Sequence, residues 1–182
     1  LVESRSGKPF NRYMQEHLFG PLAMAHSGYV LRPAMQQRLA AGHLDGMVRP
    51  QPPLRDTPAL GLYSTALDLG HLSVALLRGV VPALNADTIR EMWTPQVVAG
   101  QITLGADPGL GWFIEDDPQL GQIVRHGGST LLFGAELALL PAQGLGVVVL
   151  TNRSERPAMF LAEMLLNSVR GQLFLSSTDQ SL

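Results

Sequence analysis

The chain has 182 residues, of which 46% are hydrophobic and 15% charged, a composition typical of one folded domain rather than a disordered or coiled-coil protein. The net charge of −2 and the scattered arginines give no electrostatic basis for binding nucleic acid, and no apolar run is long enough to span a membrane. The absence of cysteine excludes disulfides, thiolate nucleophiles and cysteine-ligated metals.

The first part of the chain is predicted to be helical and loop-like. Gly7 to Phe19 carries apolar residues at helical spacing, and Gly20 followed by Pro21 predicts a left-handed glycine cap and a stop. Residues 31–58 contain five prolines and little periodicity, which predicts a long connection with a short helix over 33–40. Connections of this length often border functional sites.

Two further helices are expected before the strands. Thr65 and Asp68 have the spacing of a capping box, so we predict that a helix starts after Thr65. Its apolar face comprises Ala66, Leu69, Leu72, Ser73 and Leu76. Residues 86–93 have the pattern of a short third helix, which Pro95 stops.

After Gly105 the pattern changes to short segments rich in valine, leucine, isoleucine and aromatic residues, typical of strands. The predicted strands are Leu110–Glu115, Gln122–His126, Leu131–Leu140 and Leu145–Thr151. A turn at Pro141–Gly144 joins the last two. From Pro157 to Phe174 the sequence is helical and apolar nearly all round, which predicts a helix buried on the sheet, and the polar tail is expected to fray.

This order of helices, antiparallel strands and a closing helix predicts an α+β fold. The sequence contains no repeat or low-complexity tract, so residues 1–182 are predicted to form a single domain. Its first part, 1–104, is mostly helical and loop, and its second part, 105–175, holds the antiparallel strands and the closing helix.

The stretch from Arg125 to Arg153 carries the strongest functional signal. It predicts a strand, a turn and a second strand, with the polar cluster His126-Gly127-Gly128-Ser129-Thr130 at its mouth. Glycines let a backbone approach a ligand closely, and an imidazole changes charge near neutral pH. The cluster has the outline of half an active site, although on spacing alone a strand-end histidine with a satisfied ring is the commoner case.

The remaining histidines and glycines indicate neither a metal site nor a cofactor site. The histidines show no clustered ligand spacing. His17 lies on the apolar helix face and is expected to be packed and hydrogen-bonded, whereas His71 is expected to be solvated, and His26 and His43 fall in loops. The paired glycines lack the spacing of a dinucleotide-binding loop or a P-loop, so no cofactor is expected.

The sequence contains no familiar nucleophile motif. No Gly-x-Ser-x-Gly elbow occurs. Lys8 is the only lysine and the residue three before it is Arg5, so there is no Ser-x-x-Lys motif. None of Tyr13, Tyr29 and Tyr63 is followed two residues later by asparagine, so a Tyr-x-Asn motif is absent as well.

Even so, RHGGSTLLFGAELALLPAQGLGVVVLTNR resembles the third active-site motif of the class C β-lactamase-related serine hydrolases, a family that includes esterases, D-aminopeptidases and DD-peptidases. That family has Lys-Thr-Gly or His-x-Gly where this chain has His126-Gly127-Gly128. The segments SGKPFNRYMQEHLFGPLAM, GLYSTALDLGHL and GLGWFIED resemble other family segments in the same order. The resemblance covers most of residues 1–172.

The resemblance implies a partial β-lactamase/transpeptidase-like fold. Such a fold has an antiparallel sheet with the C-terminal helix packed on it and a helical subdomain, here with the N-terminal strands missing. The resemblance also implies a small-molecule acyl substrate, an ester, amide or β-lactam, that is processed through a serine acyl-enzyme without a metal or cofactor.

The same resemblance implies roles for particular residues. His126 would lie across the cleft, near the family's catalytic tyrosine and any substrate carboxylate. The Ser129 backbone N–H would donate a hydrogen bond to the oxyanion. The implied substrate-binding residues are Gly127, Gly128, Leu60 and Gly61. Leu60 would narrow the pocket edge, because the family often has glycine at that position.

In the family, both missing motifs precede the segment that resembles Leu1–Met24. We therefore expect an N-terminally truncated member, the C-terminal part of a serine hydrolase, whose isolated chain is inactive because its nucleophile is absent. Strand 145–151 is then expected to be an unpaired apolar edge, open to strand pairing. The alternative is a non-catalytic binding or scaffold module derived from the same fold.

Overall fold

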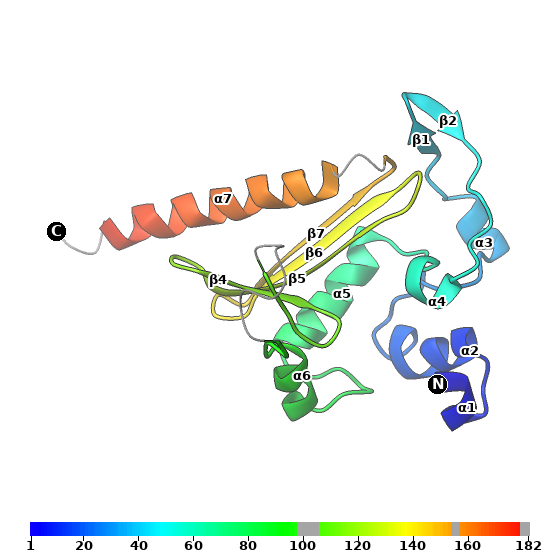
Figure 1. The fold of residues 1–182 in the computed structure, drawn as a ribbon, viewed down its shortest axis with the longest axis horizontal. Coiled ribbons are helices and arrows are strands. Elements are labelled where there is room, and N and C mark those ends of the chain that lie inside the picture. Colours follow the sequence, from blue (N-terminus) through cyan, green and yellow to red (C-terminus); the bar gives the residue numbers. More distant parts are fainter. Residues whose placement is uncertain (98–105, 154–156, 179–182) are drawn as a thin grey trace.

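A computed structural model of the chain describes residues 1–97, 106–153 and 157–178, with side chains up to Gln172. Five antiparallel strands form the main sheet at the centre of the fold (Figure 1). In sheet order the strands are β3 (Asp107–Pro108), β4 (Phe113–Asp117), β5 (Gly121–Ser129), β6 (Gly134–Leu140) and β7 (Leu145–Thr151).

Helices cover both faces of this sheet. Helix α5 (Ala66–Leu77) and helix α6 (Ala86–Met92) lie on one face, and helix α7 (Pro157–Thr178) lies on the other (Figure 1). The arrangement confirms the predicted α+β fold, the helix over 86–93 and the strand Leu145–Thr151.

The part of the chain before α5 contains short helices and a small hairpin. The helices are α1 (Val2–Ser6), α2 (Phe10–Met14), the π-helical turn η1 (Gln15–Phe19), α3 (Pro33–Gln36) and α4 (Thr57–Leu60). Strands β1 (Gly42–Leu44) and β2 (Met47–Arg49) pair in antiparallel fashion. The helix predicted over 33–40 is therefore shorter, and part of the predicted loop is a hairpin. Its turn residues Asp45 and Gly46 take φ values of 53° and 75°, as a type I′ Asp-Gly turn requires.

The helix predicted over 7–19 is confirmed in α2 and η1, but the predicted role of Gly20 is wrong. Gly20 has φ −61°, not a left-handed value, and its N–H donates to Gln15 O at 2.9 Å. A Cβ at Gly20 would lie 2.9 Å from the same oxygen. Glycine is needed there because the π-helical turn brings two backbone segments together. The left-handed residue that follows is Ala23, with φ 55°.

Helix α5 is joined to the N-terminal part of the chain through a buried carboxylate. The predicted cap is confirmed, because Thr65 Oγ1 accepts a hydrogen bond from Asp68 N at 3.1 Å. The Asp68 side chain, only 2% exposed, also accepts from His26 N at 2.8 Å and from Ser27 Oγ at 2.7 Å. A backbone bridge between Gly28 and Tyr63 runs alongside. The loop before α3 is thereby held against the start of α5.

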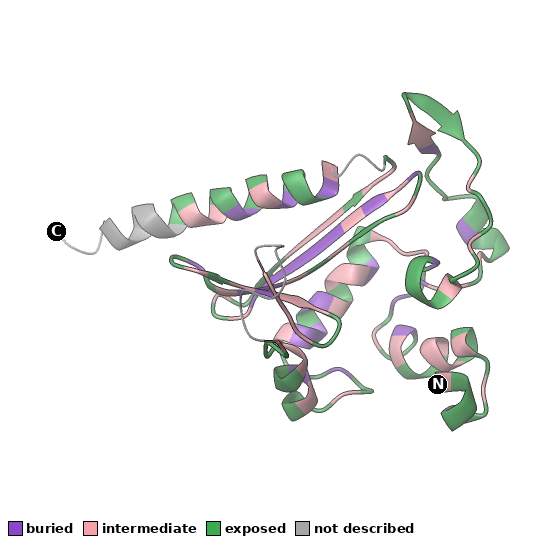
Figure 2. Ribbon diagram, viewed as in Figure 1, coloured by how far each residue is buried: buried purple, intermediate pink, exposed green. Residues whose placement is uncertain are grey.

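Alternating side chains of β6 divide the core into two layers. Leu137 and Leu139 pack toward α5 and α6, while Ala138 and Leu140 pack toward α7. Figure 2 shows β6 buried along most of its length. A strand that is buried on both faces is expected to be apolar on both, and in β6 the one exception is Glu136.

Three of the predicted strands have different bounds. Strand β6 starts at Gly134 rather than Leu131, because Thr130 N donates to Phe133 O at 2.9 Å and closes a turn there. Strand β4 starts at Phe113 rather than Leu110, because Gly109 N donates to Trp112 O at 2.8 Å and Gly111 takes φ 76°, which makes a turn. Strand β5 continues past the predicted end at His126 to Ser129. His126 to Ser129 of the polar cluster therefore lie within a paired strand, and only Thr130 belongs to the turn that follows.

The closing helix α7 is present and packs on the sheet, as predicted, but only one of its sides is buried although the sequence is apolar nearly all round. Ala162 and Leu166 are fully buried, whereas Phe160 is 65% exposed and Met164 54% exposed. Figure 2 shows buried and exposed positions alternating along α7. Among the described residues nothing packs on the exposed, outward side of α7. Strand β7 is the terminal strand of the main sheet as described, which agrees with its predicted edge position.

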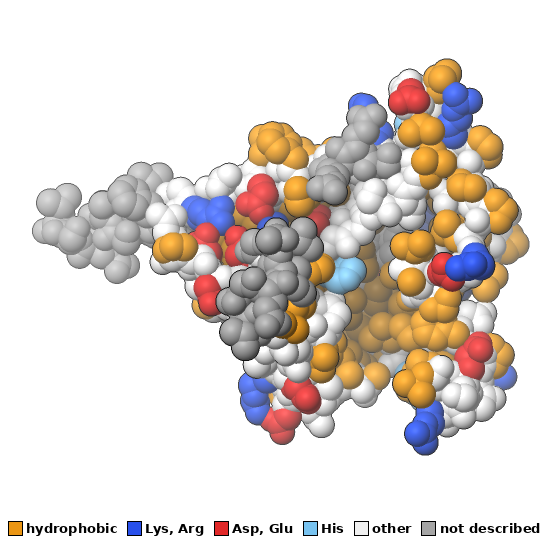
Figure 3. All heavy atoms as spheres, in the orientation of Figure 1, with side chains coloured by type: hydrophobic (Ala, Val, Ile, Leu, Met, Phe, Trp, Pro, Cys, Tyr) orange, Lys and Arg blue, Asp and Glu red, His pale blue; other side chains and the backbone are white. Residues whose placement is uncertain are grey.

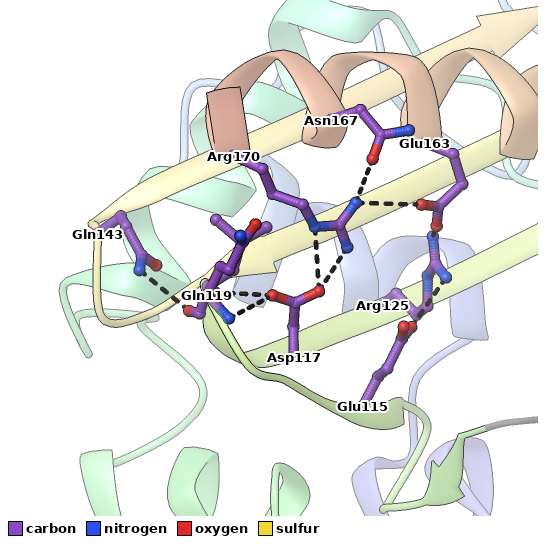
Figure 4. Close-up of polar contacts among 9 residues, drawn as sticks. Glu115, Asp117, Gln119, Arg125, Gln143, Glu163, Asn167 and Arg170 are labelled. Carbon is purple, nitrogen blue, oxygen red and sulfur yellow. Dashed lines mark hydrogen bonds and ion pairs between the residues drawn. The ribbon is translucent and has the colours of Figure 1, made fainter. Parts of the chain in front are cut away.

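A network of charged side chains fastens α7 to the sheet (Figure 4). The Arg125 guanidinium pairs with Glu115 at 3.1 Å on β4, with Glu136 at 3.2 Å on β6 and with Glu163 at 2.5 Å on α7. Nearby, Arg170 of α7 pairs with Asp117 of β4 at 2.6 Å (Figure 4). These ion pairs join three strands and the closing helix.

Burial and charge act differently on the members of this network. Burial opposes the charge on Arg125, but hydrogen bonding and attraction from Glu163, together with Glu136 and Glu115, outweigh it and raise the Arg125 pKa. Burial also raises the pKa of Glu136, and its single arginine partner only partly offsets that effect. The two shifts are compatible because Arg125 is shared among three carboxylates.

Replacing Arg125 by methionine tests whether this arginine stabilises the fold by pairing buried carboxylates. We expect Arg125→Met to lower the free energy of unfolding by about 3 kcal/mol near neutral pH, because Glu136 is left buried without a counterion. Glu136 has a raised pKa in the folded protein, so its contribution to the free energy of unfolding is largest below its unfolded pKa and is lost as pH rises and the buried carboxyl ionises. The deficit should therefore be smaller at about pH 5 than at about pH 8 in urea unfolding.

The control is Arg90→Met, which removes an exposed arginine that pairs with Asp87 on α6. It should change the unfolding free energy by less than about 0.5 kcal/mol at both pH values. Equal effects of the two substitutions would contradict the role assigned to Arg125.

Candidate active site

A wide cleft of about 1020 Å³ lies between the end of the main sheet and the N-terminal helical part. In Figure 3 it appears as a hollow with hydrophobic side chains gathered in it. All six predicted site residues line it: Leu60, Gly61, His126, Gly127, Gly128 and Ser129. The structure thus brings together positions more than sixty residues apart in the sequence, while their roles remain predictions.

His126 is exposed on the cleft side of β5. It is paired across the strands with Leu137, whose side chain belongs to the core layer beneath α5. The imidazole lies beside two aromatic rings of β4 and the preceding turn, with ring centroids 6.5 Å from Trp112 and 6.2 Å from Phe113. The sheet therefore fixes the backbone position of His126, and the aromatic pair limits where its ring lies.

The two glycines after His126 have different surroundings. A Cβ at Gly127 would lie 2.3 Å from Glu136 Oε2, so the carboxylate of the Arg125 network occupies the space that a side chain needs. A Cβ at Gly128 would meet nothing within 4 Å. Because Gly128 is two residues from His126, it shares the cleft face of the strand. Gly127 is thus explained by packing, whereas Gly128 leaves open space beside the histidine.

The turn after Ser129 is closed by its own hydrogen bonds. Thr130 N donates to Phe133 O at 2.9 Å, and Phe133 N donates to Thr130 Oγ1 at 3.2 Å. A Cβ at the next residue, Gly134, would lie 2.8 Å from Thr151 Oγ1 of β7. These contacts fix the end of β5, and with it the backbone of Ser129, against β6 and β7.

The opposite wall of the cleft comes from the long connection before α5. Gly61 N donates to Thr57 O at 2.8 Å, and a Cβ at Gly61 would lie 2.6 Å from Thr57 Cγ2, so only glycine fits this turn. Leu60 beside it is 50% exposed and borders the opening. The apolar side chains that complete this wall include Leu31, Met35, Leu39 and Leu54. The prediction that the segment 31–58 borders a site agrees with this placement.

Several residues that sequence reasoning did not single out also line the cleft: His26, Arg38, Gln51, Ser64 and Trp112. Arg38 Nη1 lies 3.2 Å from His26 Nε2. Ser64 directly precedes Thr65, the capping residue of α5. The capping motif therefore predicts that Ser64 lies at the start of a helix, but not which residues surround it in space. Gln51 belongs to the connection 31–58, which was expected to border a site, but no motif marks this residue within it.

The other histidines lie elsewhere or have structural contacts. His17 was expected to be packed, but it is exposed, with its ring centroid 4.4 Å from that of Tyr13 and the two ring planes tilted by 37°. His71 is exposed on α5, as predicted. His43 N donates to Asn152 O at 2.9 Å and fastens β1 to the end of β7. Among the described residues no three metal-binding side chains come together.

The described helices include none that is both long and apolar enough to cross a membrane.

Comparison with known proteins agrees with the geometry. The beta-lactamase family model matches residues 1–169. The human protein "Putative beta-lactamase-like 1" is 35% identical over 147 residues, which cover 78% of this chain and 29% of that protein. The "Putative D-alanyl-D-alanine carboxypeptidase" of Escherichia coli K12 is 26% identical, covering 86% of this chain and 43% of the relative.

A solved structure resembles the fold over most of its length. The octameric penicillin-binding protein homologue from Pyrococcus abyssi has a TM-score of 0.77 and 26% sequence identity, covering 93% of this chain and 40% of that one. The chain spans between 29% and 51% of the length of the curated relatives it matches. On the family match and the shared fold, the chain belongs to the beta-lactamase family of serine hydrolase-like proteins.

Proposed function

We propose that this chain forms the C-terminal wall of a serine hydrolase site that acts on an ester, amide or β-lactam through an acyl-enzyme. In this proposal His126 contacts the substrate or the proton-transferring groups, and the Ser129 backbone N–H donates to the oxyanion. The attacking serine and its general base belong to polypeptide outside these 182 residues, and the isolated chain is inactive.

The observation that carries the proposal is the common cleft of the six predicted residues. Its sheet side offers an exposed imidazole next to the open space above Gly128. Its other side is largely apolar, which suits the hydrocarbon part of an acyl group. Hydrogen-bond donors held in place by a paired strand need no reorganisation when charge develops on a carbonyl oxygen.

The chain contains neither Ser-x-x-Lys nor Tyr-x-Asn. This observation favours a second candidate, a non-catalytic binding or scaffold module of the same family. Such a module would keep the cleft without a nucleophile.

The coding sequence upstream of Leu1 distinguishes these two candidates, because the hydrolase requires Ser-x-x-Lys and Tyr-x-Asn there. With both present, the full-length protein should be labelled at one serine by a fluorophosphonate probe, and the 182-residue chain should not be labelled. Labelling of the short chain at a single serine would show that the nucleophile lies within it. Absence of both motifs upstream would favour the binding module.

Replacing His126 tests its proposed role in the full-length protein. We expect His126→Ala to reduce kcat/KM for an activated ester by about 100-fold, the low end for a residue that handles protons or charge in the transition state. His71→Ala removes an exposed histidine from α5 and is the matched control. If the two substitutions had the same small effect, His126 would be a structural residue only.

Alanine substitutions at Gly127 and Gly128 can be compared with each other, because one should affect stability and the other activity. Gly128→Ala places a methyl group in open space on the cleft side, so it should leave the unfolding free energy nearly unchanged and reduce kcat/KM by about tenfold. Gly127→Ala meets the Glu136 carboxylate, so it should destabilise the fold by about 1–3 kcal/mol in urea unfolding. The reverse pattern would mean that Gly127, not Gly128, borders the substrate.

A further inference from the structure

The wall of the cleft that faces the main sheet is built around the β1–β2 hairpin. Leu39 and Ala40 line the cleft shortly before β1, and Gln51 and Leu54 line it after β2. Within the hairpin itself, all three residues of β2 are exposed. A segment that buries so little surface of its own depends on its attachments to the rest of the molecule to hold one position.

One attachment is the side-chain amide of Asn152, the residue that follows β7. Asn152 Nδ2 lies 2.8 Å from Ala41 O. A carbonyl oxygen has no proton to donate, so the part of the Asn152 side chain that faces it is the NH2 group and not the amide oxygen. The same nitrogen lies 3.1 Å from His43 Nδ1. Its second N–H therefore donates to that ring nitrogen, which carries a lone pair, and the proton of the neutral imidazole is on Nε2.

Backbone contacts lie beside this amide. His43 N donates to Asn152 O at 2.9 Å, and a bridge pairs His43 with Arg153. Gly42 packs against the turn that follows β5, where a Cβ on Gly42 would lie 2.7 Å from Leu132 Cβ. Leu132 is fully buried, so this turn is a firm support. Residues 41–43 are thus held against the end of the main sheet.

Holding residue 41 also holds the apolar wall across the cleft from His126. Ala41 directly follows Ala40, which lines the cleft, and successive Cα atoms are only about 3.8 Å apart. The other end of the connection is held at the start of α5, where the buried Asp68 carboxylate binds the loop before α3. Apolar side chains of the wall lie between these two attachments: Leu31, Met35 and Leu39. Their distance from the sheet is therefore set from both ends.

We propose that Asn152 and His43 are positioning residues that hold this apolar wall at a fixed distance from the sheet and so determine how well the site accepts a long acyl chain. The inference rests on the proposed hydrolase function and deepens it. Loss of either side-chain contact leaves an amide N–H without its partner and lets the wall move away from the acyl chain. His43 is not among the residues that line the cleft, so its effect on substrate preference passes through Asn152 and the hairpin.

Two esters that differ only in acyl-chain length test this role in the full-length protein. They are p-nitrophenyl hexanoate and p-nitrophenyl acetate, and the quantity measured is the ratio of their kcat/KM values. Each methylene buried against an apolar wall contributes about fourfold to affinity. We expect Asn152→Ala to lower the ratio by about tenfold, which corresponds to lost contact with about two methylenes. A change that affects both esters equally cancels in the ratio.

Three further substitutions separate the loss of the hydrogen bonds from a change in side-chain size. Asn152→Asp has the same shape but no N–H to donate, so at about pH 8, where an imidazole is neutral, it should lower the ratio as much as Asn152→Ala. His43→Phe keeps a flat ring and removes the acceptor, so it should lower the ratio by about fivefold. His43→Asn places an amide oxygen near the position of Nδ1 and should keep the ratio within about twofold of wild type.

Two controls show whether loss of stability alone changes the ratio. Asn85→Ala removes the side chain that accepts from Thr88 N at 2.7 Å and caps α6, so it should lower the melting temperature without changing the ratio. His71→Phe is the matched control for His43→Phe, because His71 is exposed on α5 and does not line the cleft.

An unchanged ratio in folded Asn152→Ala and His43→Phe variants, with both esters hydrolysed, would overturn this inference and leave the proposed function standing. A lower ratio in Asn152→Ala but not in His43→Phe would mean that Asn152 contacts the acyl chain directly, which contradicts a role through the hairpin. Hydrolysis of neither ester by wild type would overturn the proposed function and this inference with it.

Discussion

The cleft depends above all on the buried carboxylate of Asp68. Its Oδ2 accepts hydrogen bonds from the backbone N–H of His26 and from the hydroxyl of Ser27, while the Asp68 N–H completes the cap of α5. One residue thus takes part in the cap at the start of α5 through its backbone and holds a distant loop through its side chain. Because a buried carboxylate without donors is costly, the loop is held in one place with respect to α5. As α5 packs on the main sheet, the two walls of the cleft keep a defined separation.

The second wall owes its properties to the two-residue period of a strand. Along β5, His126 and Gly128 face the cleft, whereas Arg125 and Gly127 face α7. The first pair is exposed and has open space beside it. The second pair belongs to the ion-pair network that fastens α7 to the sheet. A single strand therefore presents a site on one face and supports it on the other, so a substitution at one glycine acts on binding and at its neighbour on stability.

Much of this organisation could be predicted from local patterns. The capping box at Thr65, the apolar strands and the glycine turn before β7 each depend on interactions between residues close in the sequence, and these predictions agree with the structure. The predicted boundaries of β4, β5 and β6 were less accurate, because a strand ends where its partner ends. The sequence also did not show that the outward side of α7 is exposed, since periodicity alone does not show how much of an apolar surface a neighbour covers.

The sequence by itself determined the α+β class, the family and the six residues expected around the site. Helix caps, the alternation of apolar residues along strands and the hairpin motif all depend on residues that are close in the sequence. Only the tertiary structure decided which of those residues share surroundings and what each hydroxyl and carboxylate contacts. The pairing of Gly127 with Glu136, and the path from Asp68 through Ser27 to Ser64, join residues nine to forty-one positions apart. Such contacts follow from strand register and loop closure, which no local pattern specifies.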